Sequence, residues 1–257
     1  MSSLIDLIFF SEKRKNLLIQ LADGPMHIDE IKEILNVKAC AVMPQIKKLK
    51  DMDIIVQKGN VYELSDIGEV VVEKMLPLTS LLEVFDGNKD YWSKHDRSPI
   101  PRHLIQKIDM LGKCTLDEPD LDHLFEFPSH LRERLYSSKT LTSFYSYFCP
   151  DCPSIQASCA ENGAKVNLIL DEKVYNRLKI DFEDEYNTCL KNKVSLYIYS
   201  GKLRPSSFMV ADTFMLLKLF GKDGEFDHRK IMSFTPSALE WGNELAQYYI
   251  DRSEKIN

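Results

Sequence analysis

The sequence lacks any apolar run long enough to cross a membrane. A membrane-spanning helix needs about 20 consecutive, mainly apolar residues, and no stretch of the 257-residue chain approaches that length. A secretory signal is not expected either, because the segment MSSLIDLIFFSEKRK carries its charges after its apolar residues, the reverse of a signal peptide. We therefore expect a cytoplasmic protein with no membrane partner.

Motifs of common catalytic and nucleotide-binding sites are also missing. The segment GKDGEF is not followed by the Lys-Ser or Lys-Thr pair of a phosphate-binding loop, so a hairpin turn is the simpler interpretation. The spacings of metalloproteases and EF-hands do not occur, and neither do repeats or low-complexity tracts. The sequence therefore predicts no metal and no cofactor. With 44% hydrophobic and 28% charged residues, it predicts a globular protein with room for two domains.

An excess of positive charge is absent as well, since the formal net charge is −6. This excludes a generally basic coat for nucleic acid, so any contact with DNA has to come from a local patch. One such patch is KACAVMPQIKKLK, residues 38–50, which contains four lysines and no acidic residue. Taken alone, the patch could equally be the solvated face of a helix.

The segments around this patch follow the order of a winged helix-turn-helix. A helix is predicted over LIDLIFFSEKRKNLLIQLADG, where a Gly-Pro pair ends it, and a second one over HIDEIKEIL. The lysine-bearing helix, residues 38–52, comes third. Two short strands then flank Gly59-Asn60, and Ser65-Asp66 opens another helix. This order of helices and wing is typical of a DNA-binding unit.

The stretch VMPQIKKLKDMDIIVQKGNVYELSDIGEVVVEKM makes the match more specific. It resembles the DNA-binding half of archaeal winged-helix transcriptional regulators of the ArsR-like type, in particular those of methanogens that join it to a regulator middle domain. The segments PQIKKL and ELSDIGE carry the resemblance, which covers residues 1–85 in detail and the remainder by pattern. It implies a dimeric transcription factor that binds double-stranded DNA.

The resemblance places the helix of residues 38–52 in the major groove. The amide of Gln45 can both donate to and accept from an adenine edge, and Met43 can contact a thymine methyl group. Lysines are expected to meet phosphates, which fix position without reading sequence; these are Lys38, Lys47 and Lys48 on the helix and Lys58 at the wing tip. Gln45 could also be an ordinary solvated residue, because winged helices also bind proteins. Pro44 predicts either a kink in this helix or a later start.

After the wing, DIGEVVVEKMLPLTSLLEVF predicts a helix whose apolar stripe is too extensive to face water. Part of the stripe can pack on the winged helix, and the rest is predicted to pair two subunits, as the resemblance also implies. Pro77 is expected to bend this helix. A change of composition at residues 98–101 marks a boundary. We therefore divide the chain into a winged helix (1–76), a dimerisation or linker helix (77–97) and an effector-sensing domain (98–257).

The second half of the chain alternates strands with helices. The short β-branched or aromatic runs LTSFYSYF, KVNLIL, VSLYIY and FMVADTF are separated by the helical stretches SIQASCAENG and EKVYNRLKIDFEDEYNTCLKN. This alternation predicts a mostly parallel sheet covered on both faces, so the chain as a whole is α/β with an α+β winged helix at its N-terminus. A last helix is capped by Thr235, with Pro236 in its first turn. The pattern is similar to a phospholipase-D-like half-domain, the effector half of the same regulators.

Phospholipase-D chemistry requires a histidine and a lysine two residues apart and then an aspartate. His228 and Lys230 have the first spacing, but Thr235 stands where the aspartate is required. The sequence therefore predicts a binding domain and not an enzyme.

The segment FCPDCPSIQASC lies between a predicted strand and a predicted helix, at the strand edge where open α/β sheets collect ligands. Four interpretations of its cysteines remain open. Ordinary thiols near a ligand site are favoured, because six cysteines without secretory features are typical of a reduced protein. Cys149 and Cys152 could instead form a redox-responsive pair, since a helix N-terminus lowers thiol pKa values. A zinc site with Cys159 and Cys189, or a structural disulfide, completes the set.

We expect an effector site between the ends of the runs LTSFYSYF and VSLYIYS and the turn GKLRPSS. Strand polarity puts Tyr147, Cys149 and Cys152 on one side of it, while Arg204 and Ser206 could supply donors on the other. Arg204 could also be a surface residue, but beside a helix N-terminus it would suit an anionic ligand. The sequence thus predicts a homodimeric regulator whose second domain senses a small molecule. The alternative is a protein-interaction module of the transcription machinery with a non-sensing scaffold domain.

Overall fold

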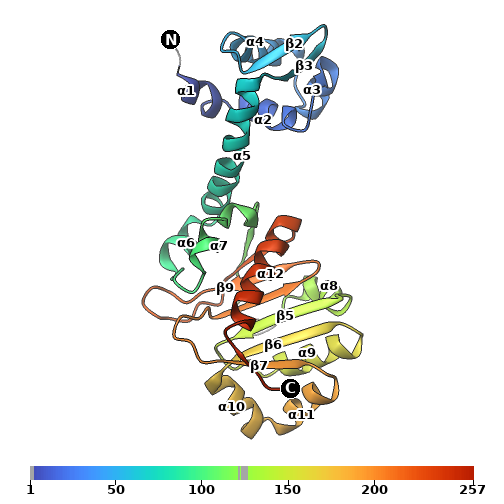
Figure 1. Ribbon diagram of the computed structural model, residues 1–257, viewed down its shortest axis with the longest axis vertical. Helices are drawn as coiled ribbons and strands as arrows, with labels where there is room; N and C mark the ends of the chain where they lie inside the picture. The colour runs from blue at the N-terminus through green and yellow to red at the C-terminus, as the bar shows by residue number, and fades with distance from the viewer. Residues whose placement is uncertain (1–2, 121, 123–126) are drawn as a thin grey trace. The chain divides into compact units, whose positions relative to one another are not determined.

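The structure of the chain is a computed structural model that describes residues 3–120, 122 and 127–257 (Figure 1). It separates into two units, Met1–Thr79 and Ser80–Asn257, each with its own hydrophobic core. Within the described residues, no helix is both long enough and apolar enough to span a membrane.

The N-terminal unit is a winged helix-turn-helix, as the sequence predicts. Strands β1, β3 and β2 form an antiparallel sheet in that order, and Gly59, with φ of +65°, forms the turn of the wing. The elements are α1 (Leu4–Phe9), α2 (Glu12–Leu21), β1 (Met26–His27), α3 (Ile28–Ile34), α4 (Ala39–Lys50), β2 (Ile55–Lys58), β3 (Val61–Leu64) and the start of α5 (Asp66–Asp86).

The first predicted helix is divided in two by Ser11. Its backbone is extended (φ −152°, ψ 109°), and its Oγ accepts a hydrogen bond from the backbone N–H of Arg14 at 3.4 Å. This is the geometry of a helix N-cap, which starts a new helix. The apolar periodicity hides the break because α1 and α2 both contribute buried residues to the same core.

Among the described residues, helices α4 and α5 each contain an internal proline. Helix α4 includes Pro44 and begins at Ala39, so the later start that Pro44 could have caused does not occur. Helix α5 continues through Pro77. Near the start of α5, Gly68 lies directly against the backbone carbonyl of Ile54, where the Cβ of any other residue would collide with it. The glycine of the ELSDIGE segment therefore permits close packing of α5 on the wing.

The C-terminal unit contains an eight-stranded sheet with the strand order β11-β7-β6-β5-β8-β9-β10-β4. Its strands are β4 (Thr115–Asp117), β5 (Thr140–Tyr145), β6 (Lys165–Asp171), β7 (Ser195–Tyr199), β8 (Ser207–Ala211), β9 (Met215–Lys218), β10 (Lys230–Ser233) and β11 (Glu254–Lys255). Its helices are the end of α5, α6 (Lys89–Lys94), α7 (Arg102–Ile105), η1 (Ile108–Leu111), η3 (Ser129–Leu131), α8 (Arg132–Tyr136), α9 (Cys152–Glu161), α10 (Glu172–Asp181), α11 (Glu183–Lys191) and α12 (Pro236–Ile250).

The sheet is mixed, and the prediction of a mostly parallel sheet is wrong. Among the described strands, only the pairs β5–β6 and β6–β7 are parallel, whereas β8, β9, β10, β4 and β11 all pair antiparallel with their neighbours. Parallel neighbours need a crossover connection, and helices provide it after β5 and β6. No helix separates β8 from β9 or β9 from β10, so these strands return directly.

Side chains of successive strand residues point to opposite faces of the sheet. One face packs against α12, through residues such as Phe144, Phe208 and Trp241. The other packs against α9, α10 and α11, through residues such as Leu168 and Met209. The predicted cover on both faces is therefore present. Thr235 caps α12 as predicted, since its Oγ1 accepts from the backbone N–H of Ala238 at 3.3 Å.

Candidate functional site

Helix α4 presents its lysines to solvent because its apolar stripe is buried. Val42, Ile46 and Leu49 lie in the core of the N-terminal unit. The predicted DNA-contacting residues Lys38, Met43, Lys47 and Lys48 are all exposed, Lys38 as the N-cap of the helix. In the part of the chain that the structure describes, this face of α4 therefore carries an excess of positive charge.

The lysine on the wing, Lys58, forms an ion pair within the N-terminal unit. The ammonium of Lys58 lies 2.5 Å from Oε1 of Glu63 on the neighbouring strand. The hydrogen bond and charge of Glu63 raise the pKa of Lys58. The carboxylate also offsets the positive charge that Lys58 would offer to a phosphate, so we expect it to contribute less than Lys47 and Lys48.

Gln45 is half-buried and is held by Arg14 of α2. Nη1 of Arg14 donates to Oε1 of Gln45 at 2.8 Å, while Nη2 and Nε of the same guanidinium donate to the backbone carbonyls of Asp6 and Leu7. Arginine has only donors, so this bond fixes which end of the amide faces α2. The amide NH₂ of Gln45 is left as the end available to a base, which favours donation over the two-way pairing expected with adenine.

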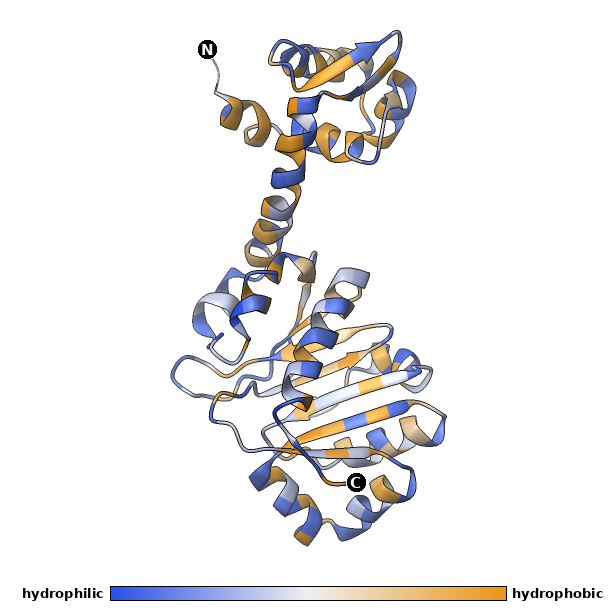
Figure 2. Ribbon diagram, viewed as in Figure 1, coloured by the Kyte–Doolittle hydropathy of each residue, from blue (hydrophilic) through white to orange (hydrophobic). Residues whose placement is uncertain are grey.

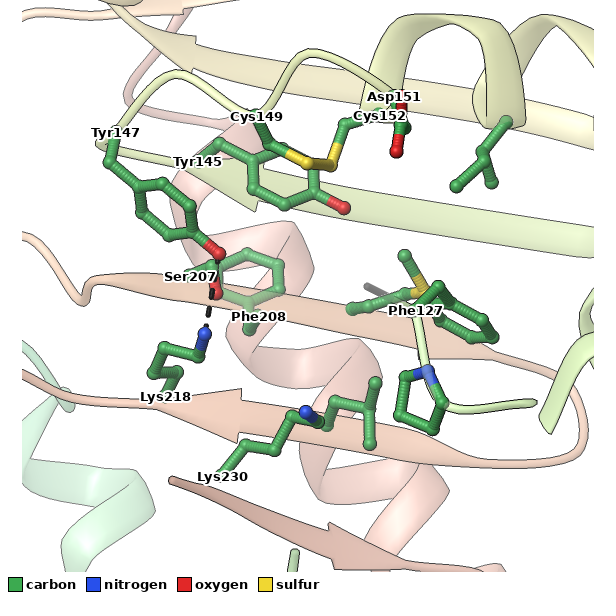
Figure 3. Close-up of a pocket in the computed structure, with 14 residues that line it drawn as sticks. Phe127, Tyr145, Tyr147, Cys149, Asp151, Cys152, Ser207, Phe208, Lys218 and Lys230 are labelled. Carbon is green, nitrogen blue, oxygen red and sulfur yellow. Dashed lines mark hydrogen bonds between the residues drawn. A yellow bond between two sulfur atoms is a disulfide. The ribbon is translucent and has the colours of Figure 1, made fainter. Parts of the chain in front are cut away.

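A cavity opens on the helix α9–α11 face of the C-terminal sheet, over β8, β9 and β10 (Figure 3). The space free of protein atoms in and around it is about 710 Å³, which includes open solvent. The predicted effector residues Tyr147, Cys149 and Cys152 line it, together with Phe127, Pro128, Tyr145, Asp151, Ile155, Ser207, Phe208, Met209, Leu216, Lys218 and Lys230.

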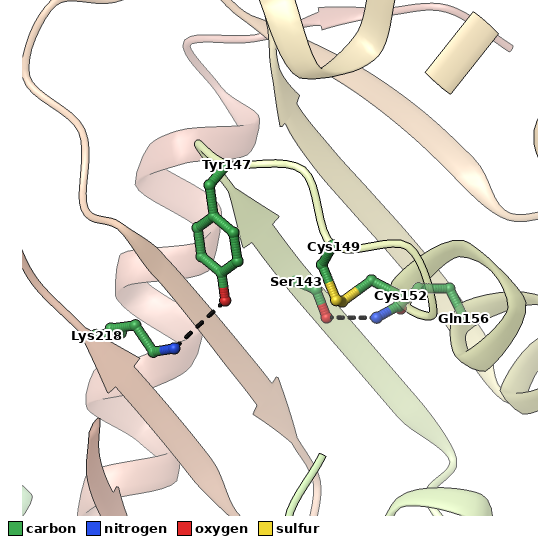
Figure 4. Close-up of a disulfide and its surroundings, with 6 residues drawn as sticks. All are labelled: Ser143, Tyr147, Cys149, Cys152, Gln156 and Lys218. Carbon is green, nitrogen blue, oxygen red and sulfur yellow. Dashed lines mark hydrogen bonds between the residues drawn. A yellow bond between two sulfur atoms is a disulfide. The ribbon is translucent and has the colours of Figure 1, made fainter. Parts of the chain in front are cut away.

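Cys149 and Cys152 form a disulfide at the wall of this cavity (Figure 4). The expectation of ordinary thiols is therefore wrong for this pair, whose three-residue separation permits ring closure between β5 and α9. A second, smaller apolar cavity lies behind it, and Tyr145, Tyr147 and both cysteines line the two cavities together. The disulfide is thus part of the partition between them.

The zinc alternative finds no support in the structure. Cys159 and Cys189 are buried free thiols, and burial raises the pKa of each to about 11. Their Sγ atoms face the backbone carbonyls of Leu135 and Pro153, at 3.8 and 3.4 Å. Over residues 3–120, 122 and 127–257, no cluster of three or more metal-binding side chains occurs.

Arg204 and Ser206 do not line the cavity. Nε of Arg204 lies 3.3 Å from Oδ2 of Asp171, at the end of β6. Ser206 is buried, and its Oγ has no hydrogen-bond partner among the described residues. The next residue, Ser207, which begins β8, lines the cavity instead.

Lys218 supplies the cavity with its unbalanced positive charge. Its side chain is buried, with 7% of the residue exposed, and Nζ lies 3.4 Å from the hydroxyl of Tyr147. Burial, and to a lesser extent the charge of Lys230, lower the pKa of Lys218 to about 8. Lys218 is not among the site residues that the sequence predicts. The sequence feature that could have identified it is a lysine inside the apolar run MLLKLF.

The second lysine of the cavity is neutralised within the fold. Nζ of Lys230 lies 2.7 Å from Oδ2 of Asp117, across the β10–β4 pair. Within the described residues, no carboxylate lies within 4 Å of the ammonium of Lys218. The two lysines are therefore chemically different, although both belong to the same wall.

The two units define a winged helix joined to an α/β domain, and comparison with known proteins gives the family. The model of the N-terminal domain of the methanogenesis regulatory protein FilR1 matches residues 3–86, and the model of its middle domain matches residues 124–252. The chain belongs to this FilR1 family. The predicted resemblance to methanogen-type archaeal regulators is thereby confirmed.

The curated relative is the methanogenesis regulatory protein FilR1 of Methanothrix harundinacea (strain 6Ac), which is 23% identical over 253 residues. The match covers 96% of this chain and 56% of the relative, so the chain spans a little over half of that protein's length. The relative is a regulatory protein. That this chain has no catalytic activity stays a prediction.

Two solved structures are distantly similar. The archaeal chromatin protein TrmBL2 aligns with 100% of this chain and 98% of its own, at 13% identity and a TM-score of 0.44. The phospholipase D family member Nuc from Salmonella typhimurium aligns with 56% of this chain and 99% of its own, at 13% identity and a TM-score of 0.43.

Proposed function

We propose that the protein is a homodimeric, cytoplasmic transcriptional regulator that binds double-stranded DNA and senses a small molecule. The observation that carries the proposal is the solvent-facing lysine surface of α4 in a winged-helix unit, on a chain whose net charge is −6. Membership of a family of regulatory proteins supports it. DNA binding is assigned to residues 1–76, dimerisation to 77–97 and sensing to 98–257.

In this proposal α4 enters the major groove. Lys47 and Lys48 neutralise phosphates, Lys38 does the same at the start of the helix, and Lys58 contacts the flanking backbone from the wing. Gln45 reads one base as a hydrogen-bond donor, and Met43 contacts a thymine methyl. Arg14 orients the amide of Gln45 by a hydrogen bond to its Oε1, so both side chains are needed for Gln45 to contact the base.

The second assignment is that the cavity of the C-terminal unit holds the effector. Its support is the lining, in which apolar and aromatic side chains surround a few polar groups, as is typical of small-molecule sites. A ligand regulates DNA binding only if it binds one conformation of the dimer better than the other. The cavity and the α4 surface would then be two sites coupled through the chain.

The test of DNA binding is its dependence on salt. A fluorescently labelled fragment selected in vitro by the protein is titrated with the full chain at several salt concentrations. Lys47→Ala and Lys48→Ala should each weaken binding to all sequences and lower the slope of log K against log salt by about one. Lys191→Ala, an exposed lysine on α11 of the other unit, is the control and should leave affinity and slope unchanged.

Two results would contradict the proposal that α4 contacts DNA. Binding that hardly changes with salt, or slopes that are the same in all three variants, would remove α4 as a phosphate-contacting surface. The winged helix would then be better explained as a module that docks on protein.

A further inference from the structure

We propose that the cavity of the C-terminal unit binds a monocarboxylate joined to an apolar body, with the carboxylate held by the ammonium of Lys218. This inference deepens the proposed sensing function and rests on it for its biological meaning. It concerns the chemistry of one site, which can be measured in the absence of DNA.

The charge of the cavity selects a single negative charge. Lys218 has no carboxylate within ion-pair distance among the residues that the structure describes, whereas Lys230 is already paired with Asp117 at 2.7 Å. Asp151, which also lines the cavity, is exposed at its edge. Among the described residues, one buried ammonium therefore remains without a carboxylate at ion-pair distance. A monoanion would neutralise it, but a dianion such as a phosphate monoester would leave a buried excess of negative charge.

Hydroxyl groups beside Lys218 complete a carboxylate site. The ammonium has three donors, and one of them is directed to the hydroxyl of Tyr147 at 3.4 Å. Figure 3 shows this hydroxyl, Ser207 and the end of Lys218 converging on one side of the cavity. A carboxylate there can accept one hydrogen bond from the ammonium and another from a hydroxyl, because it has two acceptor oxygens.

Aromatic rings support the positive charge of Lys218 but do not neutralise it. Its Nζ lies 5.3 Å from the ring centre of Tyr147 and 5.1 Å from that of Phe226. Such cation–π contacts are weak compared with a direct ion pair in a site of low dielectric. Burial lowers the pKa of Lys218, so an anion bound beside it would stabilise its charged form.

Apart from Lys230, which is paired with Asp117, and Asp151, which is exposed, the remaining wall of the cavity is mainly apolar and favours an apolar body on the ligand. Tyr145, Met209 and Leu216 form the floor from three strands, and Ile155 and Phe127 contribute from the helix side. The site thus has a polar side around Lys218, Tyr147 and Ser207 and an apolar floor of Tyr145, Met209 and Leu216. A ligand with a carboxylate at one end and a hydrocarbon or aryl group at the other matches both parts.

The experiment compares two probes of nearly equal shape. Isothermal titration of the full chain at pH 7 measures the dissociation constants of 4-butylbenzoate and of its neutral isostere 4-butylbenzamide, with inorganic phosphate as a third probe. We expect 4-butylbenzoate to bind at least tenfold more tightly than the amide, and phosphate not to bind. Lys218→Met keeps the length of the side chain but removes the charge, so the ratio of the two constants should fall to about one.

The control variant is Lys202→Met, which removes an exposed lysine from the loop before β8 and should leave the ratio unchanged. Lys218→Met is expected to fold because it removes a buried charge, and circular dichroism checks this directly. Three results would overturn the inference: equal affinity for the acid and the amide, a preference for the acid that survives in Lys218→Met, or no binding of either probe.

These outcomes are separate from those of the proposed regulatory function. A chain that binds 4-butylbenzoate through Lys218 but shows no salt-dependent DNA binding would retain this site and lose the DNA proposal. A chain that binds DNA as proposed but does not distinguish the acid from the amide would lose only the site.

Discussion

Lys218 is kept in the fold at a cost to stability. Burial lowers its pKa from 10.5 to about 8, and each pKa unit corresponds to about 1.4 kcal/mol, so the charged side chain costs about 3 kcal/mol at neutral pH. Replacing a buried charge by an apolar side chain of similar length generally restores such a cost. A residue that lowers stability in this way is a candidate for function, because structural packing alone does not call for it.

The affinity of the cavity for a carboxylate should depend on pH through Lys218. Only the ammonium form binds the anion, so affinity is full below pH 8 and is lost as the pH rises through about 8. We expect the dissociation constant of 4-butylbenzoate to rise about tenfold between pH 7 and pH 9. Titration calorimetry at both pH values measures this, with 4-butylbenzamide as the control that should not change.

The charged and titratable groups around Lys218 are Lys230, Asp117, Asp227 and Tyr147. Burial raises the pKa of Tyr147, so its hydroxyl keeps its proton over this range. Burial alone would raise the pKa of Asp227, but hydrogen bonds from Arg229 lower it, and its carboxylate stays ionised. An equal loss of affinity for the amide would show that pH changes the cavity as a whole and not Lys218.

The sequence could predict that the segment after β5 lies at the cavity, but not that β9 and β10 form its other side in place of VSLYIYS and the turn GKLRPSS. Tyr147, Cys149 and Cys152 follow a strand, and the structure places all three at the cavity. The sequence does not distinguish Ser206 from Ser207, because the residue at which β8 begins depends on its pairing with neighbouring strands. Lys218 went unnoticed because a lysine at a strand end usually reaches solvent.

At the scale of elements, helix positions were predictable from periodicity and sheet direction was not. The buried stripe of α4 and the cap of α12 follow from local sequence. The direction of β8, β9 and β10 depends on which strands they meet, information that no segment carries by itself. The break between α1 and α2 depends on one serine whose capping role is visible only in its backbone angles.

Helix α5 carries the prediction about dimerisation. Figure 2 shows apolar segments recurring along this helix, and Leu78 and Leu82 are 42% and 47% exposed there. Replacing both by glutamate would place two charges in an apolar dimer seam, so we expect the full chain to become monomeric, with the dissociation constant raised at least about 100-fold. Sedimentation velocity over a concentration series measures it.

The control for this change is the pair Leu78→Met and Leu82→Met, which keeps the surface apolar and of similar volume. That variant should sediment as the unchanged chain does. If the variant with both glutamates still forms a dimer, the interface lies outside this part of α5. If the protein without substitutions is already a monomer, the homodimer itself is excluded.

For the whole molecule, the proposed regulation requires an energetic link between two sites on separate units. Such a link is reciprocal: if a ligand changes the affinity for DNA by some factor, DNA changes the affinity for that ligand by the same factor. The proposal therefore predicts two factors that must be equal: the change in DNA affinity that the ligand causes, and the change in ligand affinity that DNA causes. It does so without any assumption about how the units are arranged, because linkage is a property of the equilibrium states alone.

The last prediction measures both numbers on the full chain. The affinity for a selected DNA fragment is determined with and without saturating 4-butylbenzoate, and the affinity for 4-butylbenzoate with and without saturating DNA. We expect equal factors, of about 5 to 150 if the coupling is of ordinary size. Lys218→Met should bind DNA as the unchanged chain does in the absence of the acid, but show no response to it. A chain that binds both partners with factors of one would possess a carboxylate site and a DNA-binding surface that do not communicate, and the C-terminal unit would then not be the sensor of this regulator.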